Sequence, residues 1–293
     1  MSVTRPTELR RWLAEYGIQP NPRWGQNFLA DGNVARCIVD AAELAPGETV
    51  VEIGPGLGAL TELLLEHGHP VVAIERDARL CQLLRDRLGA RPGFTLLGED
   101  ALDVDWTQWV PHGADTLVSN LPYSSGTRIL VRLFELARPP RRMIVTVQKE
   151  VAERIVAPAG DRERGIVSIL AQRIYDVQLL RYISPTCFWP RPEVRSALLR
   201  FELRRQPRGE PVSTVDLCEF LKAVFGGRRK QLWRALERAG WLPEAARRAG
   251  PAWLGELGIS PTDRPEQLEV EAWTRLYTAV ASQKPASGGR TCD

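Results

Sequence analysis

The 293-residue sequence is poor in the residues from which metal and redox sites are built. It has only three histidines, and its five cysteines are scattered without a Cys-x-x-Cys pair, which argues against a zinc site or a disulfide framework. No apolar run approaches the roughly 18 to 20 residues that a membrane helix needs, and the first residues lack the apolar core of a signal peptide. We therefore expect a soluble, cytoplasmic protein with reduced thiols.

Basic residues are concentrated in one part of the chain, although the formal net charge is only +3. Between Arg204 and Arg248, eleven lysines and arginines stand against five acids, with Arg228, Arg229 and Lys230 at the centre in the run GGRRKQLWRAL. Such a cluster is typical of a surface that binds a polyanion. A solvated, arginine-rich helix face explains the charge equally well, so the charge alone does not identify a partner.

Short apolar runs alternate with helical patterns of about ten residues through the first half of the chain. Strands are expected within 48–54, 70–77, 93–102, 115–123 and 141–155, and helices within 58–68, 78–89 and 127–137. This alternation predicts βαβ units, and hence an α/β, Rossmann-like parallel sheet with helices on both faces. In such sheets the ligand binds beyond the carboxyl ends of the strands.

The pattern changes near residue 185, and the change suggests how the chain is divided. Prolines punctuate the run PTCFWPRPEVRS, and the sequence beyond it reads as helices broken by glycine and proline. We expect an N-terminal arm with a loop that closes over the ligand (1–32), the α/β domain (33–205) and a small helical domain (206–281). The last residues, 282–293, have the composition of a disordered tail.

Glycines and acids follow three successive strands. Gly54, Gly56 and Gly58 let a ligand approach the backbone, and their spacing differs from the Gly-x-Gly-x-x-Gly of dinucleotide sites. Glu75 ends the second strand, where a carboxylate accepts hydrogen bonds from ribose hydroxyls, and Asp100 follows the third strand, within reach of an adenine amine. Each feature alone also fits a tight turn or a surface acid. Together they favour S-adenosylmethionine.

The run VSNLPYSSG ends the fourth strand with an amide, a proline and an aromatic ring. An adenine amine is a poor nucleophile because its lone pair is delocalised into the ring, so an enzyme must hold its hydrogens with acceptors. The Asn120 side-chain oxygen and the Leu121 carbonyl fit that role, Pro122 turns the chain, and Tyr123 offers a face for an extruded base. The alternative is a polar turn after a strand.

The chain resembles the small-subunit ribosomal RNA adenine dimethyltransferases of the KsgA type. The resemblance rests on the Asn-Leu-Pro-Tyr motif and on five further runs in the same order, which are GQNFLAD, VEIGPGLGALT, AIERD, GEDAL and VQKEVAERI. It extends from about Leu9 to Val280 and includes FWPRPEVRSALLRF, FGGRRKQLWRAL and LGISPTDRPEQLEVEAW.

The resemblance implies a class I methyltransferase that dimethylates two adjacent adenosines in a hairpin loop near the 3′ end of small-subunit RNA. The substrate is expected within a pre-ribosomal small subunit, and the enzyme is expected to be a monomer. The C-terminal helices are expected to form the RNA-binding domain, and Phe188 is expected to stack on the target base opposite Tyr123. The cofactor residues implied are Asn27, Leu29, Gly54, Gly56, Glu75, Asp100, Ala101 and Asn120, and the RNA contacts are Arg228, Arg229 and Lys230.

Three positions depart from the family pattern. Ser124 stands where the family usually has a second asparagine. Glu193 and Arg195 exchange both charges of the family's Pro-x-Pro-Lys-Val-Asp-Ser run, and we expect them to form a structural ion pair.

Two other functions share these features. A large-subunit RNA adenine methyltransferase of the macrolide-resistance type has the same catalytic motifs, although the longer C-terminal part of this chain argues against it. A ribosome-assembly factor that acts mainly by binding is the alternative from another class, and the intact Asn-Leu-Pro-Tyr run argues for activity.

Replacement of Arg228 and Arg229 by alanine is expected to weaken RNA binding and to reduce its salt dependence, because each phosphate contact releases counterions. The dissociation constant for RNA, measured over a series of salt concentrations, checks this. An unchanged slope means that the basic run is only a solvated helix face.

Overall fold

The structure is a computed structural model that describes residues 3–106, 115–227 and 230–282. The chain forms two compact units, the first from Met1–Glu153 with Asp176–Leu203 and the second from Arg154–Tyr175 with Arg204–Asp293. The sequence analysis assigned 154–175 to the α/β domain. In the structure, α7 (Ile166–Ile174) packs against α8 (Thr214–Phe225) and α12 (Val270–Ala281), which groups it with the C-terminal helices.

The first unit is built on a mixed sheet whose strand order, within the described residues, is β4-β3-β2-β5-β6-β9-β7. The parallel strands predicted from the sequence are present, and they pair in parallel with one another. Their bounds are β2 (Val50–Ile53), β3 (Val71–Ile74), β4 (Phe94–Leu97), β5 (Thr116–Asn120) and β6 (Arg142–Gln148). Two strands that the sequence analysis did not predict complete the sheet, β7 (Tyr175–Ile183) and β9 (Ser196–Leu203), and β9 runs antiparallel to β6.

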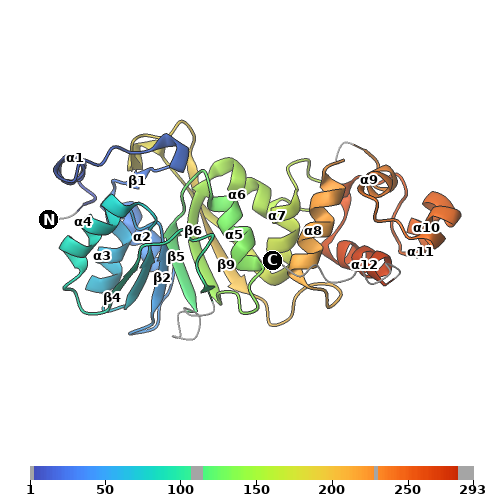
Figure 1. Ribbon diagram of the computed structural model, residues 1–293, viewed down its shortest axis with the longest axis horizontal. Helices are drawn as coiled ribbons and strands as arrows, with labels where there is room; N and C mark the ends of the chain where they lie inside the picture. The colour runs from blue at the N-terminus through green and yellow to red at the C-terminus, as the bar shows by residue number, and fades with distance from the viewer. Residues whose placement is uncertain (1–2, 107–114, 228–229, 283–293) are drawn as a thin grey trace, which may run out of the picture. The chain divides into compact units, whose positions relative to one another are not determined.

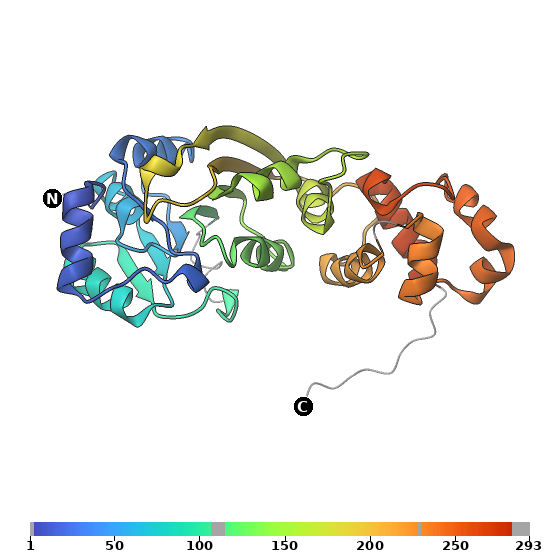
Figure 2. The same cartoon turned by 90° about the horizontal axis from the view of Figure 1, so that it is seen from above.

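Helices cover both faces of this sheet, as the alternation predicted. One face packs against α2 (Gly32–Asp40), α3 (Ala59–Glu66) and α4 (Ala78–Leu88), and α5 (Gly126–Phe134) lies on the other (Figures 1 and 2). Val71 and Ala73 of β3 belong to the core cluster that includes the apolar residues of α2, α3 and α4. They are two residues apart because successive side chains of a strand point to opposite faces.

The N-terminal arm is held by a short strand pair. The arm contains α1 (Pro6–Glu15), the 3-10 turn η1 (Pro22–Trp24) and β1 (Phe28–Leu29). β1 pairs antiparallel with β8 (Phe188–Trp189), and Leu29 lies opposite Phe188. The backbone N–H of Ala30 also donates to the carbonyl of Cys187 over 2.8 Å. A segment that the sequence indicated as a loop is thus fixed to a strand about 160 residues later by backbone hydrogen bonds.

The second unit is helical, as expected. Besides α7, α8 and α12 it contains α9 (Leu232–Ala239), α10 (Glu244–Ala249) and α11 (Trp253–Glu256). Phe220 sits at its centre, with the rings of Trp241 and Trp273 edge-on at 5.0 and 6.0 Å. Lys230 is exposed, and Arg228 and Arg229 lie outside the described residues. Among the helices of the described residues, none is long and apolar enough to cross a membrane.

The expected ion pair between Glu193 and Arg195 is not formed. Both side chains are exposed, and among the described residues no salt bridge joins them. Arg195 instead places its guanidinium over the ring of Tyr182, at 4.8 Å from the centroid. An exposed ion pair contributes little to stability, so the aromatic contact of Arg195 competes with it on equal terms.

Leu64→Ala is expected to lower the free energy of unfolding by about 2–5 kcal/mol, because Leu64 is fully buried between α3 and the sheet and the substitution leaves a cavity. Denaturant titration measures the change. Leu180→Ala is the matched control, since Leu180 is 39% exposed on β7 and its loss is expected to be nearly neutral. Equal effects of the two substitutions would contradict this description of the core.

Candidate active site

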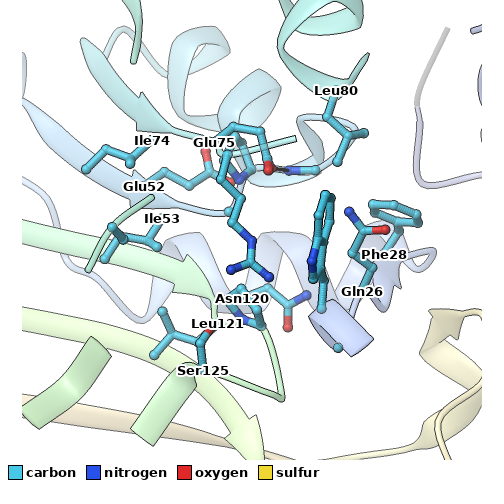
Figure 3. Close-up of a pocket in the computed structure, with 18 of the residues that line it drawn as sticks. Gln26, Phe28, Glu52, Ile53, Ile74, Glu75, Leu80, Asn120, Leu121 and Ser125 are labelled. Atoms are coloured by element: carbon cyan, nitrogen blue, oxygen red, sulfur yellow. Dashed lines mark hydrogen bonds between the residues drawn. The ribbon is translucent and has the colours of Figure 1, made fainter. Parts of the chain in front are cut away.

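A pocket opens beyond the carboxyl ends of β2, β3 and β5, where the parallel sheet predicted a ligand. Figure 3 shows Glu52 and Glu75 on one side of it, Gln26 and Phe28 of the arm on another, and Asn120 at the end of β5. The pocket is lined by all eight residues that the sequence analysis assigned to the cofactor: Asn27, Leu29, Gly54, Gly56, Glu75, Asp100, Ala101 and Asn120.

The glycine loop is shaped by positive backbone angles and by contact with its neighbours. Gly54 and Gly56 have φ of +66° and +59°, a region that L side chains rarely adopt. A Cβ on Gly56 would lie 2.8 Å from a ring carbon of Phe28 in the arm, and one on Gly54 would lie 3.4 Å from Pro122. The loop is therefore packed between the arm and the Asn-Leu-Pro-Tyr run, with its backbone facing the pocket.

Glu75 is a buried acceptor at the end of β3. Its side chain is 6% exposed and accepts hydrogen bonds from the backbone N–H groups of Asp77, over 2.9 Å, and Gly56, over 3.3 Å. Burial raises its pKa to about 7, although the two N–H groups favour the charged form. Asp77 caps α4 by accepting from the backbone N–H of Arg79.

A second buried carboxyl lies beside Glu75. Glu52, on β2, is 1% exposed and accepts a hydrogen bond of 2.6 Å from the hydroxyl of Thr61. Burial, together with the nearby charge of Glu75, raises the pKa of Glu52 to about 8, although the hydrogen bond from Thr61 opposes the rise. One wall of the pocket thus carries two carboxyl groups whose pKa values are raised, and a positively charged ligand favours their ionised form.

Asp100 is paired with an arginine that the sequence analysis did not single out. Its Oδ2 accepts from Nη1 of Arg76 over 2.9 Å, and its Oδ1 accepts from the N–H of Leu102 over 3.0 Å. Burial opposes ionisation, but these hydrogen bonds outweigh it and hold the pKa of Asp100 below its usual value. The guanidinium of Arg76 lies over the ring of Trp24, 4.8 Å from the centroid.

The Asn120 amide is oriented from two sides. Its Nδ2 donates to the backbone carbonyl of Asn27 over 3.0 Å, and its Oδ1 accepts from the hydroxyl of Thr146. These partners fix which end of the amide is oxygen, and the oxygen keeps a second lone pair for another donor. The sequence analysis missed Thr146, for which the only signal was a lone hydroxyl in the apolar strand RMIVTVQ.

Tyr123 is anchored through both its backbone and its hydroxyl. The hydroxyl bonds to that of Ser196 on β9, and the backbone N–H donates to the carbonyl of Gly25 over 3.4 Å. Burial raises the pKa of the Tyr123 phenol. A Cβ on Gly25 would lie 2.5 Å from the backbone nitrogen of Ser124, so only glycine lets the arm approach this closely.

The two residues expected to stack on the base do not line the pocket. Leu121 and Pro122 do line it, whereas Tyr123 lies beside it and Phe188 is 3% exposed within the core cluster behind β1. Phe188 has to become exposed before it can contact a base, so its stacking role stays a prediction. Ser124, the departure from the family pattern, is exposed.

The ribosomal RNA adenine dimethylase family matches residues 17–281 of the chain. The chain belongs to this family. Among curated relatives, the ribosomal RNA small subunit methyltransferase A of Streptomyces griseus is 38% identical over 285 residues, covering 96% of this chain and 94% of the relative. The enzyme of the same name from Pediococcus pentosaceus is 35% identical over 286 residues and covers 96% of both chains.

Solved structures place the fold among the methyltransferases. A dimethyladenosine transferase from Plasmodium falciparum superimposes with a TM-score of 0.71 at 20% identity, covering 87% of this chain and 98% of the other. The 23S rRNA methyltransferase ErmE gives 0.62 at 24% identity, covering 87% and 100%. The α/β architecture expected from the sequence is thus the class I methyltransferase fold.

The affinity of this dimethylase for S-adenosylmethionine is expected to increase as the pH is raised through about 7. Below that pH Glu75 is protonated and is a weaker acceptor for ribose hydroxyls; above it the carboxylate is ionised. Calorimetric titration from pH 6 to pH 8.5 measures the change. Glu75→Gln, which cannot ionise, is the control; it is expected to bind weakly and to lose the step near pH 7, while Glu52 still titrates near pH 8. A flat profile for the unmodified protein would exclude Glu75 as the ribose acceptor.

Proposed function

We propose that the protein is an S-adenosylmethionine-dependent enzyme that dimethylates the exocyclic amines of two adjacent adenosines in a hairpin loop near the 3′ end of small-subunit ribosomal RNA. The observation that carries this proposal is the uncharged Asn120 amide, held in one orientation at the edge of a pocket with a ribose-type carboxylate. The family match and the names of the curated relatives support the RNA substrate.

The residues that line the pocket suit S-adenosylmethionine chemically. Gly54 and Gly56 line the pocket without side chains, and a Cβ on Gly56 would collide with Phe28 of the arm. Glu75 presents a buried carboxyl group at the end of β3. Asp100 and Ala101 lie at the next strand end, and Leu29 lines the pocket from the arm. When bound there, S-adenosylmethionine supplies an electrophilic methyl group.

The residues at the end of β5 hold and align the target amine. The free lone pair of Asn120 Oδ1 and the Leu121 carbonyl accept its two hydrogens, which favours a more tetrahedral nitrogen whose lone pair is available. Tyr123 gives the extruded base an apolar neighbour. No charged base is needed, since a methylated ammonium loses its proton readily. The protein contributes alignment and the exclusion of water.

We also propose which form of the RNA is the substrate and where the enzyme acts. The substrate is the RNA within a pre-ribosomal small subunit, the enzyme acts as a cytoplasmic monomer, and methylation is coupled to ribosome biogenesis. The basic run around Lys230 supports RNA contact by the C-terminal helices, since phosphate contacts position an RNA without reading its sequence.

Methyl transfer to ribosomal particles tests the function directly. The protein is incubated with labelled S-adenosylmethionine and small subunits that lack the modification, and the RNA is digested and analysed for dimethyladenosine. Label in adjacent adenosines of small-subunit RNA supports the proposal. Label confined to large-subunit RNA favours a methyltransferase of the macrolide-resistance type, and tight binding without transfer favours an assembly factor.

Asn120→Ala is expected to abolish methyl transfer while it leaves cofactor affinity within a few-fold, because the amide contacts the amine rather than most of the cofactor. Thr146→Val removes the hydroxyl that orients the amide and is expected to lower kcat about tenfold. Thr146→Ser keeps the hydroxyl and is the control. Turnover at the normal rate in Asn120→Ala would contradict the role assigned to this residue.

A further inference from the structure

A connected set of contacts runs from the acidic end of the pocket to the N-terminal arm. Asp100 holds Nη1 of Arg76 at 2.9 Å, and the Arg76 guanidinium lies over the Trp24 ring at 4.8 Å from the centroid. Asp100 and Arg76 follow strands of the sheet, whereas Trp24 belongs to the arm. Arg76 therefore joins a pocket carboxylate to the arm at Trp24, and Gln26 adds a second contact nearby by donating from Nε2 to Oδ2 of Asp77 over 3.2 Å.

The same arm carries the groups that orient the catalytic run. Directly after Trp24, the carbonyl of Gly25 accepts from the N–H of Tyr123. Two residues further on, the carbonyl of Asn27 accepts from Nδ2 of Asn120 over 3.0 Å. A shift of the arm at Trp24 therefore moves the carbonyl that orients the Asn120 amide.

We propose that Arg76 is a positioning residue for methyl transfer: by bridging Asp100 and Trp24 it fixes the arm, and through the arm it fixes the Asn120 amide. The expected effect on kinetics rests on the proposed function. The link itself, by which we mean the contacts from Asp100 through Arg76 to Trp24, is a property of the free protein. It also couples the adenine end of the pocket to the target amine, because Asp100 anchors Arg76 at one end and Asn120 contacts the arm at the other.

The link requires an arginine. A guanidinium is planar, so it stacks on an indole while its edge donates to a carboxylate, and the compact ammonium of lysine does only one of these well. The side chains of Arg76 and Asp100 are 31% and 27% exposed, so the ion pair alone contributes little to global stability. Its effect is expected to be local to the arm.

Hydrogen exchange of the free protein, without cofactor or RNA, tests whether the link from Asp100 through Arg76 to Trp24 holds the arm. In Arg76→Ala, in Trp24→Leu and in Asp100→Asn, the amides of β1 and Ala30 are expected to exchange about tenfold faster than in the unmodified protein. Asp100→Asn is the decisive variant, because within the described residues no hydrogen bond joins Asp100 to the arm. Arg91→Ala removes an exposed arginine outside the pocket and is the matched control.

Arg76→Ala and Trp24→Leu remove the same contact, so we expect their effects on the exchange rate not to add. The double variant with Arg76→Ala and Trp24→Leu is expected to exchange no faster than the faster single variant. Unchanged exchange in Asp100→Asn, or a fully additive double variant, overturns the link. Either result leaves the proposed function intact, because neither measurement involves methyl transfer.

Steady-state kinetics test the positioning role. Arg76→Ala is expected to lower kcat about tenfold as well as to raise the KM for S-adenosylmethionine, because the amide loses its fixed orientation. Arg76→Lys is expected to restore part of the KM but little of kcat. A rise in KM with unchanged kcat shows that Arg76 only binds the cofactor and refutes the positioning role. If the unmodified protein transfers no methyl groups to RNA, the proposed function fails and the exchange result still stands.

Discussion

The site depends on one side chain being held from two directions. Asn120 ends β5, and the parallel register with β6 places Thr146 directly opposite it, so that the Thr146 hydroxyl bonds to the amide oxygen. The amide nitrogen bonds to the Asn27 carbonyl in the arm. The sheet alone therefore does not complete the site. The arm must also be in place; it pairs with β8, donates from Gln26 to Asp77 and, as we propose, is fixed by Arg76.

The two sides of the pocket differ in charge. At the end of β5, where we propose that the target amine binds, the acceptors are the uncharged Asn120 amide and the Leu121 carbonyl, so the lone pair of the amine is not consumed by a proton donor. The opposite wall carries Glu52 and Glu75, whose burial raises both pKa values toward neutrality. Burial without full pairing is costly for a carboxylate, and a cationic ligand relieves that cost. The same wall that resists ionisation in the free protein thus favours a sulfonium cofactor.

Much of this arrangement could be predicted from the sequence, because each pattern that indicates it involves only a few neighbouring residues. The strand–helix alternation gave the parallel sheet, and the glycine run, Glu75 and Asp100 gave the pocket wall. The strands β7 and β9 escaped prediction because prolines interrupt the segment between them. Thr146 and Arg76 escaped because their partners lie far along the chain, and only the register of β5 with β6 and the closure of the arm bring them together. Phe188 is buried on β8, opposite Leu29 of β1, and its stacking role stays a prediction.

The most direct test of the central claim is a crystal structure of the protein with S-adenosylhomocysteine and an adenosine-containing RNA hairpin. We expect the ribose hydroxyls on Glu75, the adenine of the cofactor product beside Asp100, and the amine of the target adenosine within hydrogen-bonding distance of Asn120 Oδ1. A ligand bound away from the end of β5, or an Asn120 amide turned so that its nitrogen faces the target amine, would contradict the account.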